Sequence, residues 1–207
     1  MTPMKHCGCS ETHQSRRVVL TGGPGAGKTA VLELVRQALC EHVKILPEAA
    51  GIVFGGGFPR GTDLELRRAA QRAIFYVERE LENVGAVGNP AVVLCDRGTI
   101  DGMAYWPDTS GYLESVGTTL EEQYARYDAV IHLRTPDAAN GYNQLNPLRI
   151  ESVAQARAID DRILHAWQGH PHRFVVEAST DFMEKAGRAI EILYNEVPAC
   201  CRTTSAR

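Results

Sequence analysis

Long apolar runs are missing from this sequence, and so is an excess of charge of one sign. The 207 residues carry a net charge of −3, and 44% of them are hydrophobic. The longest apolar stretches, such as AVVLC at 91–95, are far shorter than the roughly 20 residues that a membrane-spanning helix needs. Nucleic-acid binding normally requires a concentrated basic face, which this composition does not indicate. We therefore expect one compact domain with neither a membrane span nor a nucleic-acid partner.

The first fifteen residues, MTPMKHCGCSETHQS, lack the apolar segment of a signal peptide, so we expect a cytoplasmic protein with reduced thiols. Two histidines and two cysteines in this stretch suggest a metal site: His6, Cys7, Cys9 and His13. C-x-C with flanking histidines is a loose pattern, however, because zinc sites usually show wider, paired spacings. We interpret residues 1–15 and 198–207 as flexible tails. The second tail would leave Cys200 and Cys201 in a frayed terminus.

Short apolar segments alternate with helical periodicity along the chain. Five segments predict strands: RRVVLTG (16–22), HVKILPE (42–48), AVVLCDRG (91–98), DAVIHLRT (128–135) and RFVVEAS (173–179). Helices are predicted at 28–41, 62–84, 119–127, 152–167 and 181–197, the second of them opening with a capping box at TDLE (62–65). Two irregular stretches remain, at 51–61 and 105–117. The alternation predicts an α/β fold with a doubly wound, five-stranded, mostly parallel sheet in a single domain, residues 16–197.

A phosphate-binding loop follows the first predicted strand. In VVLTGGPGAGKTAVLELV (18–35), the residues Gly22, Gly27, Lys28 and Thr29 satisfy G-x-x-x-x-G-K-[ST]. Glycines let the backbone N–H groups point inward at a polyphosphate, and the N-terminus of the next helix attracts negative charge. The lysine reaches the β- and γ-phosphates, and the threonine hydroxyl binds Mg²⁺. We therefore predict a P-loop NTPase fold that binds ATP, or GTP, with Mg²⁺. The residues expected to bind the nucleotide are Gly22, Gly23, Pro24, Gly25, Ala26, Gly27, Lys28, Thr29 and Ala30.

The third predicted strand ends in Asp96, which we expect to organise Mg²⁺ together with Thr29. Its neighbour is Arg97, whereas dedicated ATPases usually carry a glutamate there to activate water. GTPases of the switch type usually carry N-K-x-D after a later strand, and none follows the fourth strand here. Both absences favour another class of P-loop protein.

GGPGAGKTAVL together with LCDRGTIDGMAYW resembles the NadR-like P-loop domains, which include nicotinamide riboside kinase domains, and more distantly the deoxynucleoside and thymidylate kinases. The resemblance covers roughly residues 16–195. It implies that Asp96 and Arg97 lie beside the phosphoryl acceptor and that Glu48, after the second strand, takes the proton of the acceptor hydroxyl. It also implies an arginine-bearing lid between the last two strands, within about 136–158, with Arg149 as the catalytic arginine and Arg157 as second candidate. Kinase lids often carry several arginines, whereas this one has a single arginine between Tyr142 and Glu151.

Three further residues are candidates for binding the acceptor. Asp101 and Tyr105, one helical turn apart, could bind a sugar hydroxyl and stack on a base, the latter role being open to Trp106 as well; Arg60 could hold the acceptor from the glycine-rich loop. A helix N-terminal aspartate, a core aromatic residue and a surface arginine are equally ordinary interpretations. The function predicted is transfer of the γ-phosphoryl group of ATP to a hydroxyl of a small, nucleoside-like acceptor, by Lys28, Glu48, Asp96, Arg97 and Arg149. The alternative is a nucleotide-dependent regulatory or binding module with weak hydrolysis.

Overall fold

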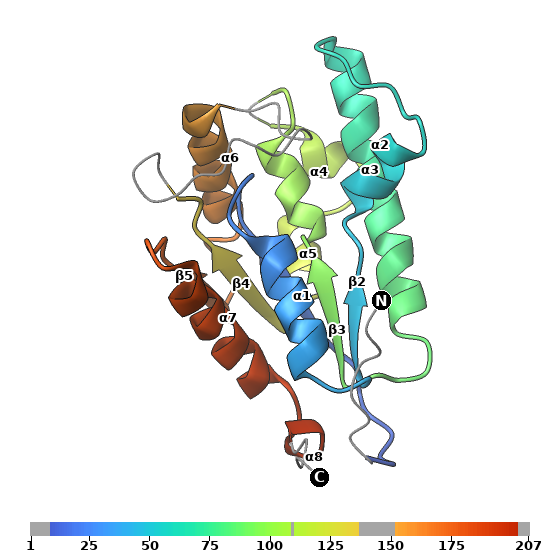
Figure 1. Cartoon of the computed structure of the whole chain (residues 1–207). Helices are drawn as coiled ribbons and strands as arrows, with labels where there is room; N and C mark the ends of the chain where they lie inside the picture. Colours follow the sequence, from blue (N-terminus) through green and yellow to red (C-terminus); the bar gives the residue numbers. More distant parts are fainter. Residues whose placement is uncertain (1–8, 109, 137–151, 203–207) are drawn as a thin grey trace.

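A computed structural model describes residues 9–108, 110–136 and 152–202. Five parallel strands form one sheet in the order β2-β3-β1-β4-β5 (Figure 1). Their bounds are β1 Arg16–Thr21, β2 Val43–Leu46, β3 Val92–Asp96, β4 Ala129–Leu133 and β5 Arg173–Val176. The predicted α/β fold and all five strands are confirmed. The sheet is entirely parallel, where the sequence predicted a mostly parallel one.

Helices cover both faces of the sheet (Figure 1). The helices are α1 Lys28–Ala38, α2 Ala49–Gly55, α3 Leu64–Gly85, the 3-10 helix η1 Thr99–Ala104, α4 Tyr112–Ser115, α5 Leu120–Tyr124, α6 Val153–Ala166, α7 Phe182–Glu196 and α8 Ala199–Arg202. Side chains alternate along a strand, so Val18 and Leu20 of β1 pack under α1 and α7, whereas Val19 packs with α6 and η1. No helix in the described ranges is both long and apolar enough to cross a membrane.

Helix starts follow the capping residues, with one correction. Ser152 and Thr119 each close a capping box at α6 and α5, because the third helical residue returns a hydrogen bond to the cap. The capping box predicted at Thr62 is wrong: the cap of α3 is Asp63, whose side chain accepts hydrogen bonds from the amides of Glu65 and Leu66. The stretch 51–61, predicted as irregular, begins within α2.

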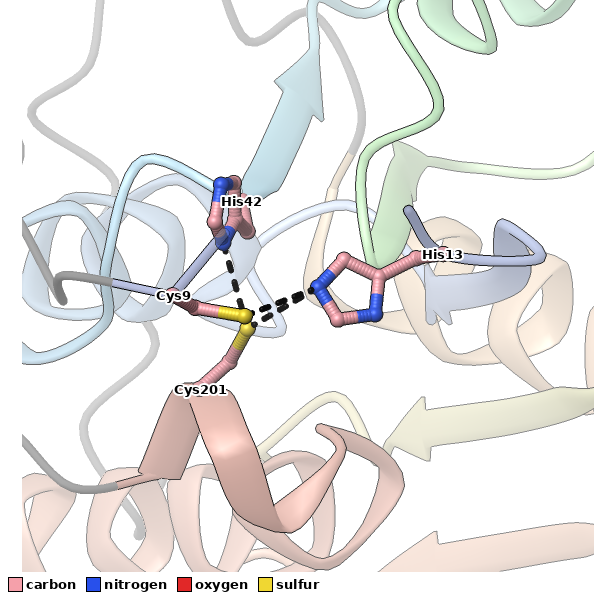
Figure 2. Close-up of side chains that lie close together, drawn as sticks. All are labelled: Cys9, His13, His42 and Cys201. Carbon is pink, nitrogen blue, oxygen red and sulfur yellow. Dashed lines mark hydrogen bonds between the residues drawn. The ribbon is translucent and has the colours of Figure 1, made fainter. Parts of the chain in front are cut away.

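The ends of the described chain pack against the domain. Cys201 on α8 is 1% exposed, so the interpretation of this cysteine as part of a frayed terminus is wrong. It lies beside Cys9, His13 and His42 (Figure 2). Cys9 also packs against the core formed by β1, α1 and α7. His6 and Cys7 lie outside the described residues.

Candidate active site

Strand pairing brings the predicted catalytic residues to one edge of the sheet. In parallel pairs, Leu20 of β1 lies opposite Asp96 of β3, and Leu46 of β2 lies opposite Cys95 of β3. Glu48 and Arg97 each come two residues after the second pair, so the register sets them side by side. This is the carboxyl edge of the strands, next to β1, where the strand order reverses and ligands of open α/β sheets bind.

The loop between β1 and α1 has the backbone that a phosphate loop requires. Gly25 and Gly27 have φ of 78° and 95°, a region that side-chain-bearing residues rarely adopt. Gly23 is needed for a different reason: a Cβ there would lie 2.6 Å from Thr135 Oγ1 and 2.7 Å from Asp160 Cβ. The loop is therefore fixed in shape by its glycines and by what packs behind it.

Lys28, the first residue of α1, folds back over this loop. Its Nζ donates hydrogen bonds to the carbonyl oxygens of Gly22, at 2.9 Å, and Gly23, at 3.3 Å. The residue is 8% exposed. Burial, and then the positive charge of Arg97, lower the pKa of Lys28 to about 8. An anion in the loop would relieve both effects, because it would compensate the buried charge.

Asp96 ends β3 and borders the same cavity as Lys28 and Thr29. Its Oδ1 is buried, and no described residue hydrogen-bonds to it. Burial raises the pKa of Asp96, although Lys28 and Arg97 act in the opposite direction. A buried carboxylate oxygen without a described partner, on the same cavity as Thr29, suits a hard cation such as Mg²⁺, so these residues fit the magnesium ion that a P-loop implies.

Arg97 links the elements of the site. Its φ of 80° is unusual for a residue with a side chain, and such strain often occurs at functional positions. Its guanidinium donates to Glu48 Oε1 at 2.6 Å, to the Gly22 carbonyl at 3.2 Å and to Asp101 Oδ2 at 3.3 Å. Only glycine fits at position 98, because a Cβ on Gly98 would lie 2.6 Å from the ring of Trp167. The D-R-G sequence is thus accounted for residue by residue.

Glu48 is the N-cap residue of α2 and borders the cavity. Burial alone would raise its pKa, but the charge and hydrogen bond of Arg97 outweigh burial, and the pKa of Glu48 is lowered. The carboxylate is therefore ionised at neutral pH.

Asp101 lies in η1 and is 3% exposed. Its Oδ2 accepts hydrogen bonds from Thr21 Oγ1 at 2.5 Å and from Arg97, and its Oδ1 accepts one from Trp167 Nε1 at 2.6 Å. With three donors already on its two oxygens, this carboxylate is suited to holding Arg97 in place. Direct binding of a sugar hydroxyl by Asp101 stays a prediction that these contacts do not favour.

The two aromatic candidates, Tyr105 and Trp106, lie in different surroundings. Tyr105 borders the cavity, with the Arg97 guanidinium 5.5 Å from its ring centroid. Trp106 packs instead against Tyr112 in a separate buried cluster, and its Nε1 donates to the Ser110 carbonyl, so of the two interpretations left open it is the core aromatic residue. Arg60 is exposed at the cavity wall, 4.2 Å from the ring centroid of Phe54.

The predicted lid is only partly described. Arg149 lies outside the described residues. Arg157, the second candidate, is exposed on α6 and does not border the cavity.

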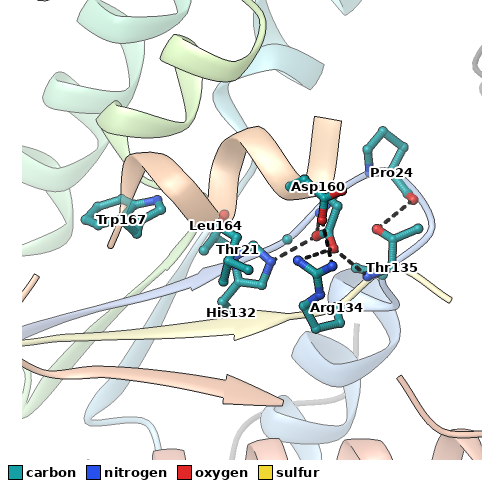
Figure 3. A network of polar contacts seen from close by, with 12 residues as sticks. Thr21, Pro24, His132, Arg134, Thr135, Asp160, Leu164 and Trp167 are labelled. Carbon is teal, nitrogen blue, oxygen red and sulfur yellow. Dashed lines mark hydrogen bonds and ion pairs between the residues drawn. The ribbon is translucent and has the colours of Figure 1, made fainter. Parts of the chain in front are cut away.

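A buried network behind the phosphate loop was not predicted. Figure 3 shows Asp160 on α6 pointing at the loop between β1 and α1. Its Oδ1 accepts from the Gly23 amide at 2.8 Å and contacts His132 Nε2 at 2.9 Å; its Oδ2 accepts from the Thr135 amide at 3.1 Å and pairs with Arg134 at 3.2 Å. The sequence offered one signal of this network: His132 lies inside the apolar strand β4. A buried polar side chain of this kind requires a hydrogen-bond partner.

A second unpredicted residue is Glu78 on α3, which borders the cavity while only 7% exposed. Its Oε1 is buried, and no described residue hydrogen-bonds to it. Burial, and then the charge of Glu82, raise the pKa of Glu78 well above its ordinary value. It is therefore a candidate for a neutral carboxylic acid that donates a hydrogen bond into the cavity.

The cavity itself has a volume of about 770 Å³ and two ends. The phosphate end is bordered by Gly25, Lys28, Thr29 and Asp96. The other end lies between α2, α3 and η1 and is bordered by Phe54, Arg60, Gln71, Ile74, Glu78 and Tyr105. Glu48 and Arg97 border the same cavity. Pockets that bind drug-sized molecules typically have a volume of about 300–1,000 Å³. The cavity volume therefore lies in the range usual for a ligand pocket.

Comparison with known proteins agrees with this geometry. The model of a family described as an AAA domain, AAA_28, matches residues 17–185, which is most of the chain. The chain belongs to this AAA-domain family. A search of curated proteins gave no match.

Two solved structures are similar to this AAA domain in fold. One is a thymidylate kinase from Candida albicans, with a TM-score of 0.61 and 14% identity over 87% of this chain and 92% of that chain. The other is a NadR protein in complex with NR, with a TM-score of 0.66 and 14% identity over 92% of this chain and 54% of that chain. This chain thus spans about half the length of that NadR protein. The predicted P-loop kinase-like fold and its likeness to NadR are confirmed.

Proposed function

We propose that this protein transfers the γ-phosphoryl group of ATP to a hydroxyl group of a small, nucleoside-like acceptor. The observation that carries the proposal is the shape of the cavity. It includes Lys28 and Thr29 of the phosphate loop, the Glu48–Arg97 pair, and a compartment lined by residues of α2 and α3. A module that only binds nucleotide has no need of such a compartment beside the terminal phosphate.

The phosphate end would hold the nucleotide and its metal. Amides of Gly25, Gly27, Lys28 and Thr29 and the Lys28 ammonium would bind the phosphates, and Thr29 and Asp96 would hold Mg²⁺. Mg²⁺ held there would supply positive charge that offsets the charge developing on the phosphates. Lys28 would exchange its contacts with Gly22 and Gly23 for phosphate oxygens.

In the transfer, the acceptor oxygen forms a bond to the γ-phosphorus as the bond to the bridging oxygen of ATP breaks, and ADP leaves. The acceptor proton passes to Glu48, which its lowered pKa keeps in the ionised form that a base requires. Arg97, held 2.6 Å from Glu48, supplies a positive charge beside the transferring group. Asp101 keeps that guanidinium in position.

The acceptor end offers groups suited to a nucleoside-like molecule. Tyr105 and Phe54 provide aromatic surface for a base, and Arg60 and Gln71 provide donors. Glu78 would donate a hydrogen bond as a neutral acid, and this selects an acceptor that carries a hydroxyl or carbonyl oxygen there.

The test is ATP-to-ADP turnover measured with a panel of nucleosides, nicotinamide riboside, small sugars and alcohols. We expect one nucleoside-like compound to stimulate turnover and to gain a phosphate in equal amount, seen by mass spectrometry. Slow turnover that no compound stimulates would reject the transferase and favour the nucleotide-dependent regulatory module.

Glu48→Gln tests the proposed base. Losing the proton acceptor should lower kcat with the stimulating acceptor by about 10²–10⁴-fold. Glutamine keeps an oxygen for Arg97, so affinity for ATP should change little. Glu33→Gln is the matched control, because Glu33 is an exposed carboxylate on α1 that pairs with Arg36. An unchanged kcat in Glu48→Gln would remove this residue from the chemistry.

The lowered pKa of Lys28 predicts a pH dependence. The free enzyme needs the charged ammonium to capture ATP, and that proton is lost as the pH rises through about 8. Log kcat/KM for ATP should therefore be level below pH 8 and fall above it with a slope approaching −1. Lys28→Arg, which stays charged, should have lower activity but no such fall. A profile that stays level to pH 9.5 in the unchanged protein would contradict the assignment.

A further inference from the structure

Four side chains far from the cavity come together where the two ends of the described chain meet. They are Cys9 and His13 in the N-terminal segment, His42 just before β2, and Cys201 on α8 (Figure 2). One ligand atom from each lies within 4.8 Å of the others. Cys201 is buried, and the other three are half-buried.

The spacing of the atoms fits a tetrahedral metal ion. Sulfur to nitrogen distances are 3.5 Å from Cys9 to His13 Nε2, 3.4 Å from Cys201 to His13 Nε2 and 3.3 Å from Cys201 to His42 Nδ1. A zinc ion with Zn–S of about 2.3 Å and Zn–N of about 2.0–2.1 Å holds such atoms about 3.5 Å apart at the tetrahedral angle. Two sulfurs and two imidazole nitrogens in this geometry are the ligands that select Zn²⁺.

Hydrogen bonds outside the group of four hold each of the three segments that carry these residues. His42 is tied to the sheet, because its carbonyl accepts from the Val92 amide at 3.1 Å. Helix α8 is tied to α7, because Arg202 Nε donates to the Val197 carbonyl at 2.6 Å and Tyr194 donates to the Arg202 carbonyl at 2.8 Å. The N-terminal segment is held at Ser15, which donates to the Pro90 carbonyl at 2.7 Å. Three separately anchored segments converge on one point.

We propose that Cys9, His13, His42 and Cys201 bind a structural zinc ion that fastens both ends of the described chain to the amino edge of the sheet. His42 precedes β2 while Glu48 follows it, so the ion lies at the opposite edge from the phosphate loop. Four protein ligands leave no open coordination position, as in structural rather than catalytic zinc sites. Because metal binding stabilises only the folded arrangement, the ion would raise the thermal stability of the whole domain.

The direct test is metal content. The full chain, without a histidine tag, is produced with zinc in the medium, purified under reducing conditions and desalted. We expect one zinc per chain by elemental analysis. Cobalt substitution should give the visible absorption of a tetrahedral ion with thiolate-to-metal charge transfer. An octahedral cobalt spectrum, or no bound metal, would overturn the proposal, as would a Cys9–Cys201 disulfide found in this reduced protein.

Matched variants test which residues bind the zinc. Cys9→Ser and His13→Asn should lose the zinc, because each removes one half-buried ligand. Cys200→Ser should keep it, because Cys200 is exposed and lies outside the group of four. A chelator should lower Tm by about 5 °C or more in the unchanged protein and in Cys200→Ser, and should leave Cys9→Ser unaffected. Equal zinc content in Cys9→Ser and the unchanged protein would reject the site.

Discussion

Lys28→Met is expected to lower kcat/KM for ATP by about 10²–10³-fold or more while leaving the fold intact. In the proposed function, the ammonium is the charge of the loop that would reach the terminal phosphates, and nothing in methionine replaces it. In the free protein, by contrast, Lys28 is a buried cation whose pKa is lowered to about 8 by burial and by Arg97. Removing an unfavourable buried charge should keep Tm unchanged or raise it slightly.

The measurements are ATP affinity by calorimetry, steady-state turnover, and Tm. Lys44→Met is the control, because Lys44 lies exposed on β2, away from the phosphate end of the cavity. ATP affinity in Lys28→Met equal to that of the unchanged protein would show that the loop does not bind phosphate as proposed. Lost affinity together with a large fall in Tm would mean that Lys28 supports the fold instead.

Asp160→Ala should destabilise the protein by about 3–5 kcal/mol, because it breaks a buried ion pair and removes a carboxylate that four partners share. Those partners are Arg134, His132 and the amides of Gly23 and Thr135. Since one of them belongs to the phosphate loop, ATP affinity should fall as well. Denaturant unfolding gives the first quantity and calorimetry the second.

The neighbouring residue supplies the control for this change. Asp161 also pairs with Arg134, at 2.7 Å, but its side chain is 63% exposed. Surface pairs contribute about 0–1 kcal/mol, so Asp161→Ala should cost far less than Asp160→Ala. Equal losses in the two variants would mean that burial of the network contributes nothing.

How much of the site could be predicted depends on how far apart its cooperating residues are in the sequence. The phosphate loop is contiguous, so its motif predicted both its shape and its place between β1 and α1. Glu48 and Asp96 were placed correctly at the sheet edge because parallel strands end there together. Asp160 and Gly23 are 137 positions apart and meet only after α6 packs on the sheet, so neither predicts the other.

Local geometry explains why Trp106 is a core residue and does not border the cavity. The segment Thr99–Ala104 is a 3-10 helix, which places successive side chains at a different angle from the α-helix that was assumed. Trp106 packs in one cluster with Phe75 of α3 and Tyr112 of α4, and the local sequence does not predict this contact. Of the four proposed zinc ligands, the sequence singled out Cys9 and His13 but not His42 and Cys201, because these two lie outside the N-terminal segment.

The two ends of the cavity are built from different stretches of the chain. The phosphate end comes from the loop after β1 and the end of β3, whereas most of the opposite wall comes from residues 50–78 on α2, α3 and the turn between them. Substitutions within residues 50–78 can therefore change the shape of the wall opposite the phosphate loop without changing the residues proposed to bind phosphate. Selection could change which compound is modified while the donor stays the same, and an engineer could exchange this one contiguous block to do so.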